Sequence, residues 1–486
     1  MHSSGAGVGP LPAPSGRKVP AVPWSEVAGV QVMGVSTGHP TPADERDRSR
    51  AVLSRLVRGL QAVVPADLPA MGDRADLLDE VWNTVHRDVF GEPPALPSEL
   101  SHGPDLGALM QRGPFVGYLE RTQVGSYVLD LSVFATYTHR PAARSLAVLA
   151  TFSAQSGRLR CDTITELETA TVHTPDSANW SLACRLVACA LLTHTLIVRH
   201  VGGCHLFVSG PTAVCVRNHL RPDHPVALLL WPHVHGALEA NNRVVPSVLD
   251  ARPGPGLFAD VFNLEGRAVW HLLSDEAAVF DLRRLDPVYD RCARGMQDAP
   301  IDTPTLDDAE ALWTVLSRYT SGWVHHHYPS ERALLQDSEL VAFVDRLGEA
   351  VPGGVGSVAG RPVTRAGLSR LCALLLYNAS VQHELVGNLL WDYAPWAMHV
   401  PSWMGRDGSG PGLGVYQRFM RSLGGMCVPS RRLMSDWTFL APDMRSRSLV
   451  YALQADLARR QATMETEGPR ASHRLYPADL EAVVGM

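Results

Sequence analysis

The stretch from residue 180 to residue 205 reads WSLACRLVACALLTHTLIVRHVGGCH and is apolar along most of its length. Arg185, Arg199 and His200 interrupt it, so it falls short of the roughly 20 uninterrupted apolar residues of a membrane span. A helix that is apolar on nearly every side is buried inside a large core. The segment therefore predicts a buried helix over residues 180–220 at the centre of a helical domain.

The chain around this helix has mostly helical patterns. Apolar residues recur at helical spacing over two or three amphipathic helices in 47–90. Later helices are expected over 223–243, 307–327, 331–348, 364–392, 413–424 and 443–464. Residues 112–172 are β-rich instead, with a turn at Ser156 and Gly157. We expect a mainly α fold with a small antiparallel β-sheet near its N-terminal side.

Composition and charge limit the chain's function and surroundings. The 486 residues are 45% hydrophobic, which is enough for a large core, and the net charge of -6 argues against a nucleic-acid partner. The eight cysteines contain no CxxC pair and are expected to be reduced, as in the cytoplasm. Residues 1–22 are rich in Gly, Pro and Ser and are expected to form a disordered tail before one domain over 23–486.

Two histidines inside the central helix lie five residues apart, at His200 and His205. In an α-helix such positions differ by about 140° and cannot face one ion. A wider π-type turn reduces the difference to about 50°, and such turns concentrate at functional sites. Gly202 and Gly203 leave room for this turn, so the spacing is compatible with a metal site but is by itself only a weak signal for one.

A third histidine, His383, lies in another long apolar helix about 180 residues later. Neutral imidazoles on two facing core helices are a common way to build a buried iron site. Two or three histidines with a carboxylate leave coordination positions open for water or dioxygen.

The histidine segments resemble the lipoxygenase family, and the resemblance extends over residues 145 to 486. Its first block is the metal helix, in which Trp180, Ala183 and Val187 occur at the family's positions before His200 and His205. The other blocks follow in family order, at residues 217–241, 308–313, 323–340, 379–383 and 480–486.

The resemblance implies a fold, a ligand set and a reaction. The fold would be a lipoxygenase-like catalytic domain without the family's N-terminal β-sandwich. The ligands would include the three histidines and the terminal carboxylate of Met486. A ferric iron with a bound hydroxide, or manganese in its place, would abstract hydrogen from a bis-allylic carbon, and O2 would add to give a hydroperoxide. No catalytic side chain beyond that hydroxide is implied.

Several positions depart from the family's pattern. The fourth residue after His383, where the family has another ligand, is Gly387, and Asn388 follows it. Either Asn388 reaches the iron through a π-type turn or the site has one ligand fewer. Glu384 is a further change. Leu390 or Trp391 replaces a family glutamine, and Ser209 replaces an acidic residue.

These departures leave alternatives to a fatty-acid oxygenase. One is a related oxygenase or oxidase that acts on a different specialised metabolite, and another is a catalytically silent, ligand-binding relative. In each case the expected partner is a small apolar molecule, with O2 for the enzymes. The protein is expected to be a monomer or weak oligomer without stable membrane insertion.

Other polar clusters are weaker candidates for a site. Three consecutive histidines at 325–327 point about 100° apart on a helix and cannot chelate one ion together. His233 and His235 favour packing or hydrogen bonding, and His194 could line a channel near the iron. The loop beginning at Asp407 lacks the lysine and the preceding strand of a phosphate-binding loop.

Overall fold

The computed structural model describes residues 11–16, 18–19, 24–27, 30–33, 43–45, 94–248, 261–411 and 431–484. The helices expected in 47–90 and 413–424, and the proposed ligand Met486, lie outside these residues.

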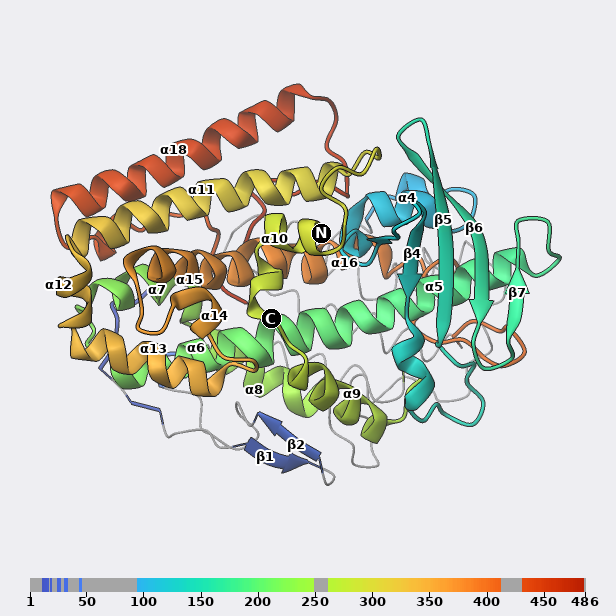
Figure 1. The fold of residues 1–486 in the computed structure, drawn as a ribbon, viewed down its shortest axis with the longest axis horizontal. Helices are drawn as coiled ribbons and strands as arrows, with labels where there is room; N and C mark the ends of the chain where they lie inside the picture. The colour runs from blue at the N-terminus through green and yellow to red at the C-terminus, as the bar shows by residue number, and fades with distance from the viewer. Residues whose placement is uncertain are drawn as a thin grey trace, which may run out of the picture.

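The predicted central helix is confirmed as one continuous rod. It consists of α5 (Trp180–His194), the π-helix η5 (Thr195–Ser209) and α6 (Gly210–His219). In Figure 1 it crosses the middle of the molecule, with other helices on several sides. By length and composition it could cross a membrane, but 78% of its most apolar window is buried inside the protein. A core helix of a folded domain has this property.

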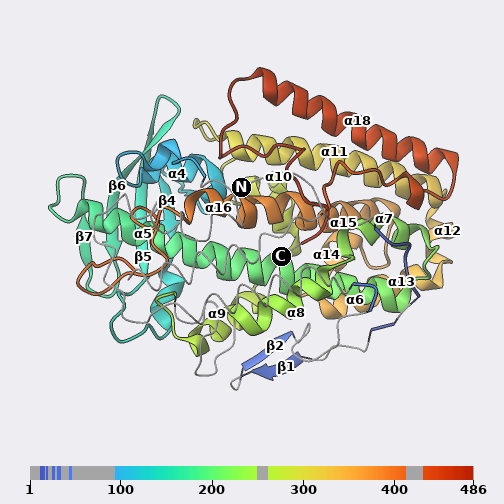
Figure 2. The ribbon, with the colours of Figure 1, turned by 180° about the vertical axis from the view of Figure 1, so that it is seen from behind.

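A second core helix faces the first. It runs from α15 (Arg365–Tyr377) through the π-helices η7 (Asn378–Gln382) and η8 (Glu384–Asn388) to α16 (Leu390–Tyr393). Its π-helical part contacts η5. The long helices α11 (Pro304–His327) and α18 (Met444–Thr466) pack together over this layer, as Figures 1 and 2 show from opposite sides.

Shorter helices complete the described part of the domain. The α-helices are α4 (Leu106–Gln111), α7 (Pro225–Val234), α8 (Ala237–Val248), α9 (Gly266–Ala278), α10 (Pro287–Ala293), α12 (Glu331–Leu335), α13 (Ser338–Ala350) and α14 (Gly356–Ala359). Single 3-10 turns are η2 (Ser98–Leu100), η3 (Gly113–Phe115), η4 (Ser132–Thr136), η6 (Leu282–Leu285) and η9 (Thr438–Leu440).

Two predicted helices are each divided in the structure. The helix expected over 223–243 breaks at Gly236, whose φ of 104° is costly for any residue with a side chain. The helix expected over 331–348 breaks before Asp337, whose carboxylate accepts a hydrogen bond from the Leu340 amide and so caps α13. Local capping chemistry therefore sets these boundaries.

The predicted small sheet is confirmed as a five-stranded antiparallel sheet with sequential strand order. Its strands are β3 (Glu120–Arg121), β4 (Tyr127–Asp130), β5 (Val148–Gln155), β6 (Arg158–Glu166) and β7 (Thr171–His173). Ser156 and Gly157 turn between β5 and β6 with positive φ. The sheet packs on one end of α5, and a separate antiparallel pair joins β1 (Trp24–Val27) to β2 (Val30–Met33).

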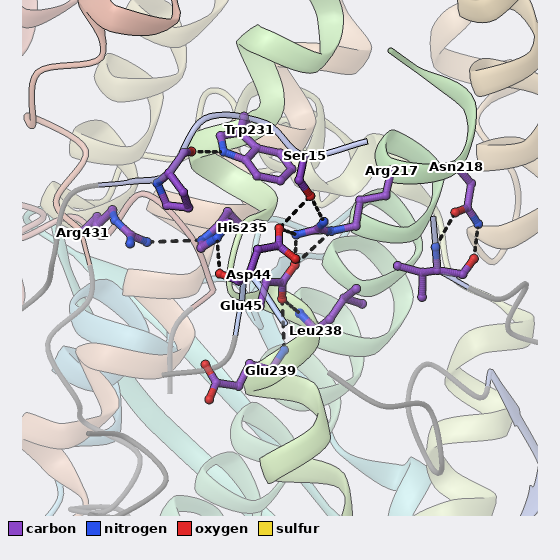
Figure 3. A network of polar contacts seen from close by, with 12 residues as sticks. Ser15, Asp44, Glu45, Arg217, Asn218, Trp231, His235, Leu238, Glu239 and Arg431 are labelled. Carbon is purple, nitrogen blue, oxygen red and sulfur yellow. Dashed lines mark hydrogen bonds and ion pairs between the residues drawn. The ribbon is translucent and has the colours of Figure 1, made fainter. Parts of the chain in front are cut away.

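Part of the N-terminal segment contacts the helical domain. Arg217, buried on α6, donates hydrogen bonds to Asp44, Glu45 and Ser15 at 2.6–3.1 Å (Figure 3). Trp231 donates to the carbonyl oxygen of Pro12 at 2.7 Å. Residues 11–16 belong to the segment expected to be a disordered tail. In the structure, Pro12 and Ser15 accept hydrogen bonds from residues of the helical domain. A domain boundary at residue 22 stays a prediction.

Asp308, on α11, is fully buried and holds the C-terminal region in place. It accepts hydrogen bonds from Arg474 at 2.6 and 2.9 Å, from the Leu475 amide at 3.2 Å, and from Arg460. Asp308→Asn should cost about 3 kcal/mol in the free energy of unfolding, because breaking a buried ion pair typically costs about 3–5 kcal/mol and both arginines are partly exposed. Urea unfolding measures this loss.

The neighbouring carboxylate provides a matched control. Asp307 pairs with Arg291 at 2.9 Å, but its side chain is 60% exposed. Asp307→Asn should cost less than about 1 kcal/mol, as exposed ion pairs do. Equal losses for the two variants would contradict a special role for the buried residue.

Candidate metal centre

The structure brings together the three histidines that the sequence singled out. The Nε2 atoms of His200 and His383 lie 3.0 Å apart, those of His205 and His200 3.2 Å, and those of His383 and His205 3.3 Å. The side chains are buried, with residue exposures of 5%, 0% and 1% for His200, His205 and His383. Two core helices thus point three imidazoles at one spot.

Local π-helical geometry makes this convergence possible. His200 and His205 both lie in η5, where a five-residue step turns the side-chain direction by only about 50° beyond a full turn. The predicted π-type turn is therefore confirmed. Gly202 packs closely against α9, because a Cβ there would lie 2.8 Å from Cδ2 of Leu273 and that side chain would have to shift. His383 lies between the two π-helices of the facing helix.

Two of the imidazoles, those of His200 and His383, are held in the neutral form that ligates metals. Burial, and then the neighbouring imidazoles, hold the pKa of His200 and of His383 well below the ordinary value of 6.5. His205 has a further constraint, because its Nδ1 lies 3.0 Å from the Oδ1 of Asn241. If Nδ1 carries the proton and donates it to this oxygen, the lone pair of Nε2 points into the cluster.

The spacing of the three nitrogens tests whether a metal ion fits. A neutral imidazole Nε2 carries either one proton or one lone pair, so three such atoms in mutual contact cannot all be satisfied by hydrogen bonds. An ion bound at about 2.1 Å with angles near 90° would keep its nitrogen ligands about 3.0 Å apart. The observed 3.0–3.3 Å fits a single ion bound by all three.

Asn241, on α8, is a functional residue that the sequence showed only as part of a resembling block. Its Nδ2 also donates to the backbone oxygen of His205 at 3.1 Å, so the amide contacts both ends of this ligand. Asn241→Leu should weaken metal binding by about 10–100-fold, as loss of such orienting contacts typically does. Competitive chelator titration checks the expectation, and an unchanged dissociation constant would contradict it.

A second amide joins the two ligand-bearing helices. Asn378, at the start of η7, donates from Nδ2 to the Cys204 carbonyl oxygen at 3.1 Å and to Ser209 Oγ at 3.0 Å. Ser209 is the residue that replaces the family's acidic side chain. Its hydroxyl therefore has a structural partner here, and the contact fixes the distance between η5 and η7.

The residue that faces the cluster after His383 is Gly387. A Cβ built on it would lie 2.7 Å from Nε2 of His200, so no side chain fits there without moving that ring. Asn388 is half-buried, and its Nδ2 donates to the carboxylate of Glu384 at 2.6 Å. Burial raises the pKa of Glu384 to about 8. Asn388 as a metal ligand stays a prediction, with its amide nitrogen already bonded to Glu384.

The C-terminal segment runs through the core toward the cluster. Leu480, Ala482 and Val484 are fully buried, and the Ala482 carbonyl oxygen lies 2.6 Å from Nδ1 of His233. Oε2 of Glu481 is 3.9 Å from Nδ1 of His383, which is beyond hydrogen-bond range. Met486 lies outside the described residues, and its carboxylate as a ligand stays a prediction.

The other polar candidates lie away from the triad. His326, His327 and Asp443 could form a small cluster, but Asp443 caps α18 and hydrogen-bonds His326 at 2.9 Å. His235 lies 3.1 Å from the Asp44 carbonyl oxygen. In the loop at Asp407, the Asp407 carboxylate accepts hydrogen bonds from the backbone amide and the hydroxyl of Ser409. His194 lines a cavity, described below.

Fold and site together define a helical protein with a buried three-histidine centre between two π-helices. A model of the lipoxygenase family matches residues 137–422, more than half of the chain. The chain belongs to the lipoxygenase family.

Individual family members are distant in sequence. The chain is 29% identical over 211 residues to a linoleate 9/13-lipoxygenase of Pseudomonas aeruginosa, covering 43% of this chain and 30% of that protein. It is 30% identical over 234 residues to a polyunsaturated fatty acid lipoxygenase of Mus musculus, covering 46% and 34%. The chain thus aligns with about a third of the length of these relatives.

The fold is shared over a much larger part of the chain. The solved structure of a calcium-dependent 11R-lipoxygenase superimposes with a TM-score of 0.79 over 92% of this chain and 75% of its own, at 16% identity. The expected lipoxygenase-like helical fold is therefore confirmed.

Proposed function

We propose that the protein is a non-heme iron oxygenase of the lipoxygenase type. The observation that carries the proposal is the convergence of three buried imidazoles, whose Nε2 atoms lie within 3.3 Å of one another, on two core helices with π-helical segments. Iron is the proposed metal, with manganese as the alternative. When bound, iron supplies the one-electron chemistry that removes a hydrogen atom from an activated C–H group before O2 adds to the carbon.

The chain's own residues hold and protect this chemistry. His200, His205 and His383 would bind the ion through Nε2, with Asn241 orienting His205. The Met486 carboxylate and Asn388 are proposed as further ligands. The helices around the triad exclude water, since leucine, valine and alanine side chains bury the site. A dry site prevents side reactions of a substrate radical.

A polyunsaturated fatty acid is the first proposed substrate. It is supported by family membership and by the names of similar proteins, which refer to linoleate and polyunsaturated fatty acids. A different specialised metabolite is the second proposal, favoured by Gly387 at the position of a family ligand. We further propose a cytoplasmic protein, monomeric or weakly associated, without membrane insertion.

Metal analysis and oxygen uptake test the proposal on the purified full chain. We expect about one iron per chain, with oxygen consumption and conjugated-diene absorbance upon addition of linoleic or arachidonic acid. A chain that takes up neither iron nor manganese contradicts the oxygenase and supports the silent relative. An iron-loaded chain that leaves both acids unchanged contradicts the fatty-acid substrate and favours the second class.

An extension of the C-terminus tests the carboxylate ligand separately. Residues appended after Met486 should lower metal content, because they would move the carboxylate, whereas the same residues added before Met1 should not. Equal metal content in the two proteins would contradict Met486 as a ligand and leave the histidine triad in place.

A further inference from the structure

A cavity of about 580 Å³ lies along the flank of the two metal-binding helices. Gly203 of η5 lines it, as do Gln382 and Leu385 on either side of His383. The described lining does not include the triad itself. This cavity can therefore hold a molecule beside the candidate metal centre. The side chains that would bind this molecule are not those of the triad.

One wall of the cavity carries a hydrogen-bonded phenol and imidazole. The Tyr118 hydroxyl lies 2.8 Å from Nδ1 of His194 and 3.0 Å from Oγ1 of Thr195. Burial raises the pKa of Tyr118 to about 12 and lowers the pKa of His194, so both groups are neutral near pH 7. His194 is about nine-tenths buried, and its Nε2 faces Glu276 at 3.8 Å, too far for a hydrogen bond.

The His194 imidazole next to Glu276 is therefore neutral and does not balance the charge of this carboxylate. The Glu276 side chain is 25% exposed, and no arginine or lysine lies within 4.0 Å of it among the described residues. Among the other carboxylates of the cavity wall, Asp290 pairs with Arg284 and Arg294 and Asp281 pairs with Arg283. Glu120 and Asp130, like Glu276, have no arginine or lysine within 4.0 Å among the described residues. A partly desolvated carboxylate without a cation is a good partner for a ligand's ammonium group.

Arg199 lies on the same wall of the cavity and carries a positive charge. Its guanidinium carbon lies 3.6 Å from the centre of the Tyr118 ring, and its Nη2 donates to the Gly117 carbonyl oxygen at 2.6 Å. Within the described part of the chain, no carboxylate lies within 4.0 Å of it. Its remaining N–H donors suit a carboxylate, which arginine binds in a two-point geometry.

Part of the remaining wall is apolar, although Asp281, Arg284 and Arg294 also line the cavity. Val198, Phe207, Phe280 and Leu385 line it, and the two phenylalanine rings meet edge to face at 5.4 Å. A Cβ on Gly203 would meet only the Val198 carbonyl oxygen, at 3.6 Å, so the glycine keeps this side open. Mostly apolar walls with a few placed polar groups are typical of small-molecule sites.

We propose that this cavity is a second small-molecule site, for a compound with an amino-acid head group and an apolar body. The carboxylate pairs with Arg199 and the ammonium with Glu276, while Tyr118 and His194 supply hydrogen bonds between them. An amine alone would leave Arg199 unmatched, and a carboxylate alone would meet the charge of Glu276. The site is additional to the proposed oxygenase function and does not depend on bound metal.

Three related probes test the head group by calorimetry on metal-free and metal-loaded protein. L-Phenylalanine carries both charges, 3-phenylpropanoate only the carboxylate and phenethylamine only the ammonium. We expect L-phenylalanine to bind on the order of tenfold or more tighter than either analogue, because each charged hydrogen bond adds this much. Absence of binding by L-phenylalanine, L-tryptophan and L-leucine, or equal binding of the three phenyl probes, would overturn the proposal.

Two charge-removing variants assign the ends of the head group. Arg199→Gln should weaken L-phenylalanine and 3-phenylpropanoate but not phenethylamine, and Glu276→Gln should show the reverse pattern for the two analogues. Arg158→Gln, exposed on β6 and outside the cavity, is the control and should bind all three probes as the parent does. Thermal melting confirms that each variant is folded, and folded variants that bind like the parent would also overturn the proposal.

Discussion

A His383→Ala variant is expected to lose most of its metal affinity while remaining folded. Its Nε2 contacts both other ligand atoms, at 3.0 and 3.3 Å, and it is the only member of the triad on the second helix. A four-ligand zinc site binds its ion with a free energy of about 10–16 kcal/mol. Divided among the four ligands, this corresponds to roughly a hundredfold to a thousandfold change in the dissociation constant for each ligand that is lost. Metal content after dialysis against a chelator measures the loss.

His326→Ala is the matched control for this experiment. His326 belongs to the other cluster of possible ligands in the described residues, but it lies at the surface beside a helix cap. Its replacement should leave the metal content of the protein unchanged. If both variants kept their metal, the buried triad would not be the binding site. If only the His326→Ala variant lost its metal, the ion would bind beside the N-terminal end of α18 and not at the triad.

A Gly387→Ala variant should weaken metal binding almost as much as His383→Ala does, although it removes no proposed ligand. The added methyl group would lie 2.7 Å from Nε2 of His200 and 3.1 Å from the two adjacent ring carbons. Since interiors are close-packed, the ring must move away from the other two imidazoles. We expect metal affinity to fall by on the order of a hundredfold and stability by about 1–3 kcal/mol, as overpacking typically costs.

Gly348→Ala separates this effect from a general response to losing a helical glycine. A Cβ on Gly348, in α13, would meet Val355 at 3.6 Å, which is ordinary contact. This variant should bind metal like the parent. Unchanged metal affinity in Gly387→Ala would show that His200 moves freely, and the geometry of the triad would then not depend on the glycine.

The three candidate histidines could be predicted from the sequence because the helices and motifs that contain them are local patterns. His200 and His205 lie in one helix, and their five-residue spacing has a metal-binding meaning only if the helix widens, which η5 does. His383 lies in a second apolar helix, and two apolar helices in one domain must pack together to bury their surfaces. Apolar patterning therefore predicted the two helices, and the resemblance to the lipoxygenase family selected these three among the 20 histidines of the chain.

The sequence did not show which residue after His383 points toward the three histidines. One step along a helix rotates a side chain by about 100°, so a small change in winding decides whether Gly387 or Asn388 points inward. The π-helical turn of η8 and the bond from Asn388 to Glu384 set this phase, and Gly387 faces His200.

By itself the sequence predicted the fold class, the central helix and the three histidines, because helical periodicity is a property of short segments and the family-like motifs are continuous stretches of sequence. Only the tertiary structure decided the contacts that orient and surround them. Asn241 meets His205 across 36 positions, and Tyr118 meets His194 across 76. Such contacts arise when helices and strands pack, and no local pattern encodes their direction. Within the described part of the chain, the same packing leaves Arg199 facing the cavity without a carboxylate, and Glu276 without an arginine or lysine, within 4.0 Å.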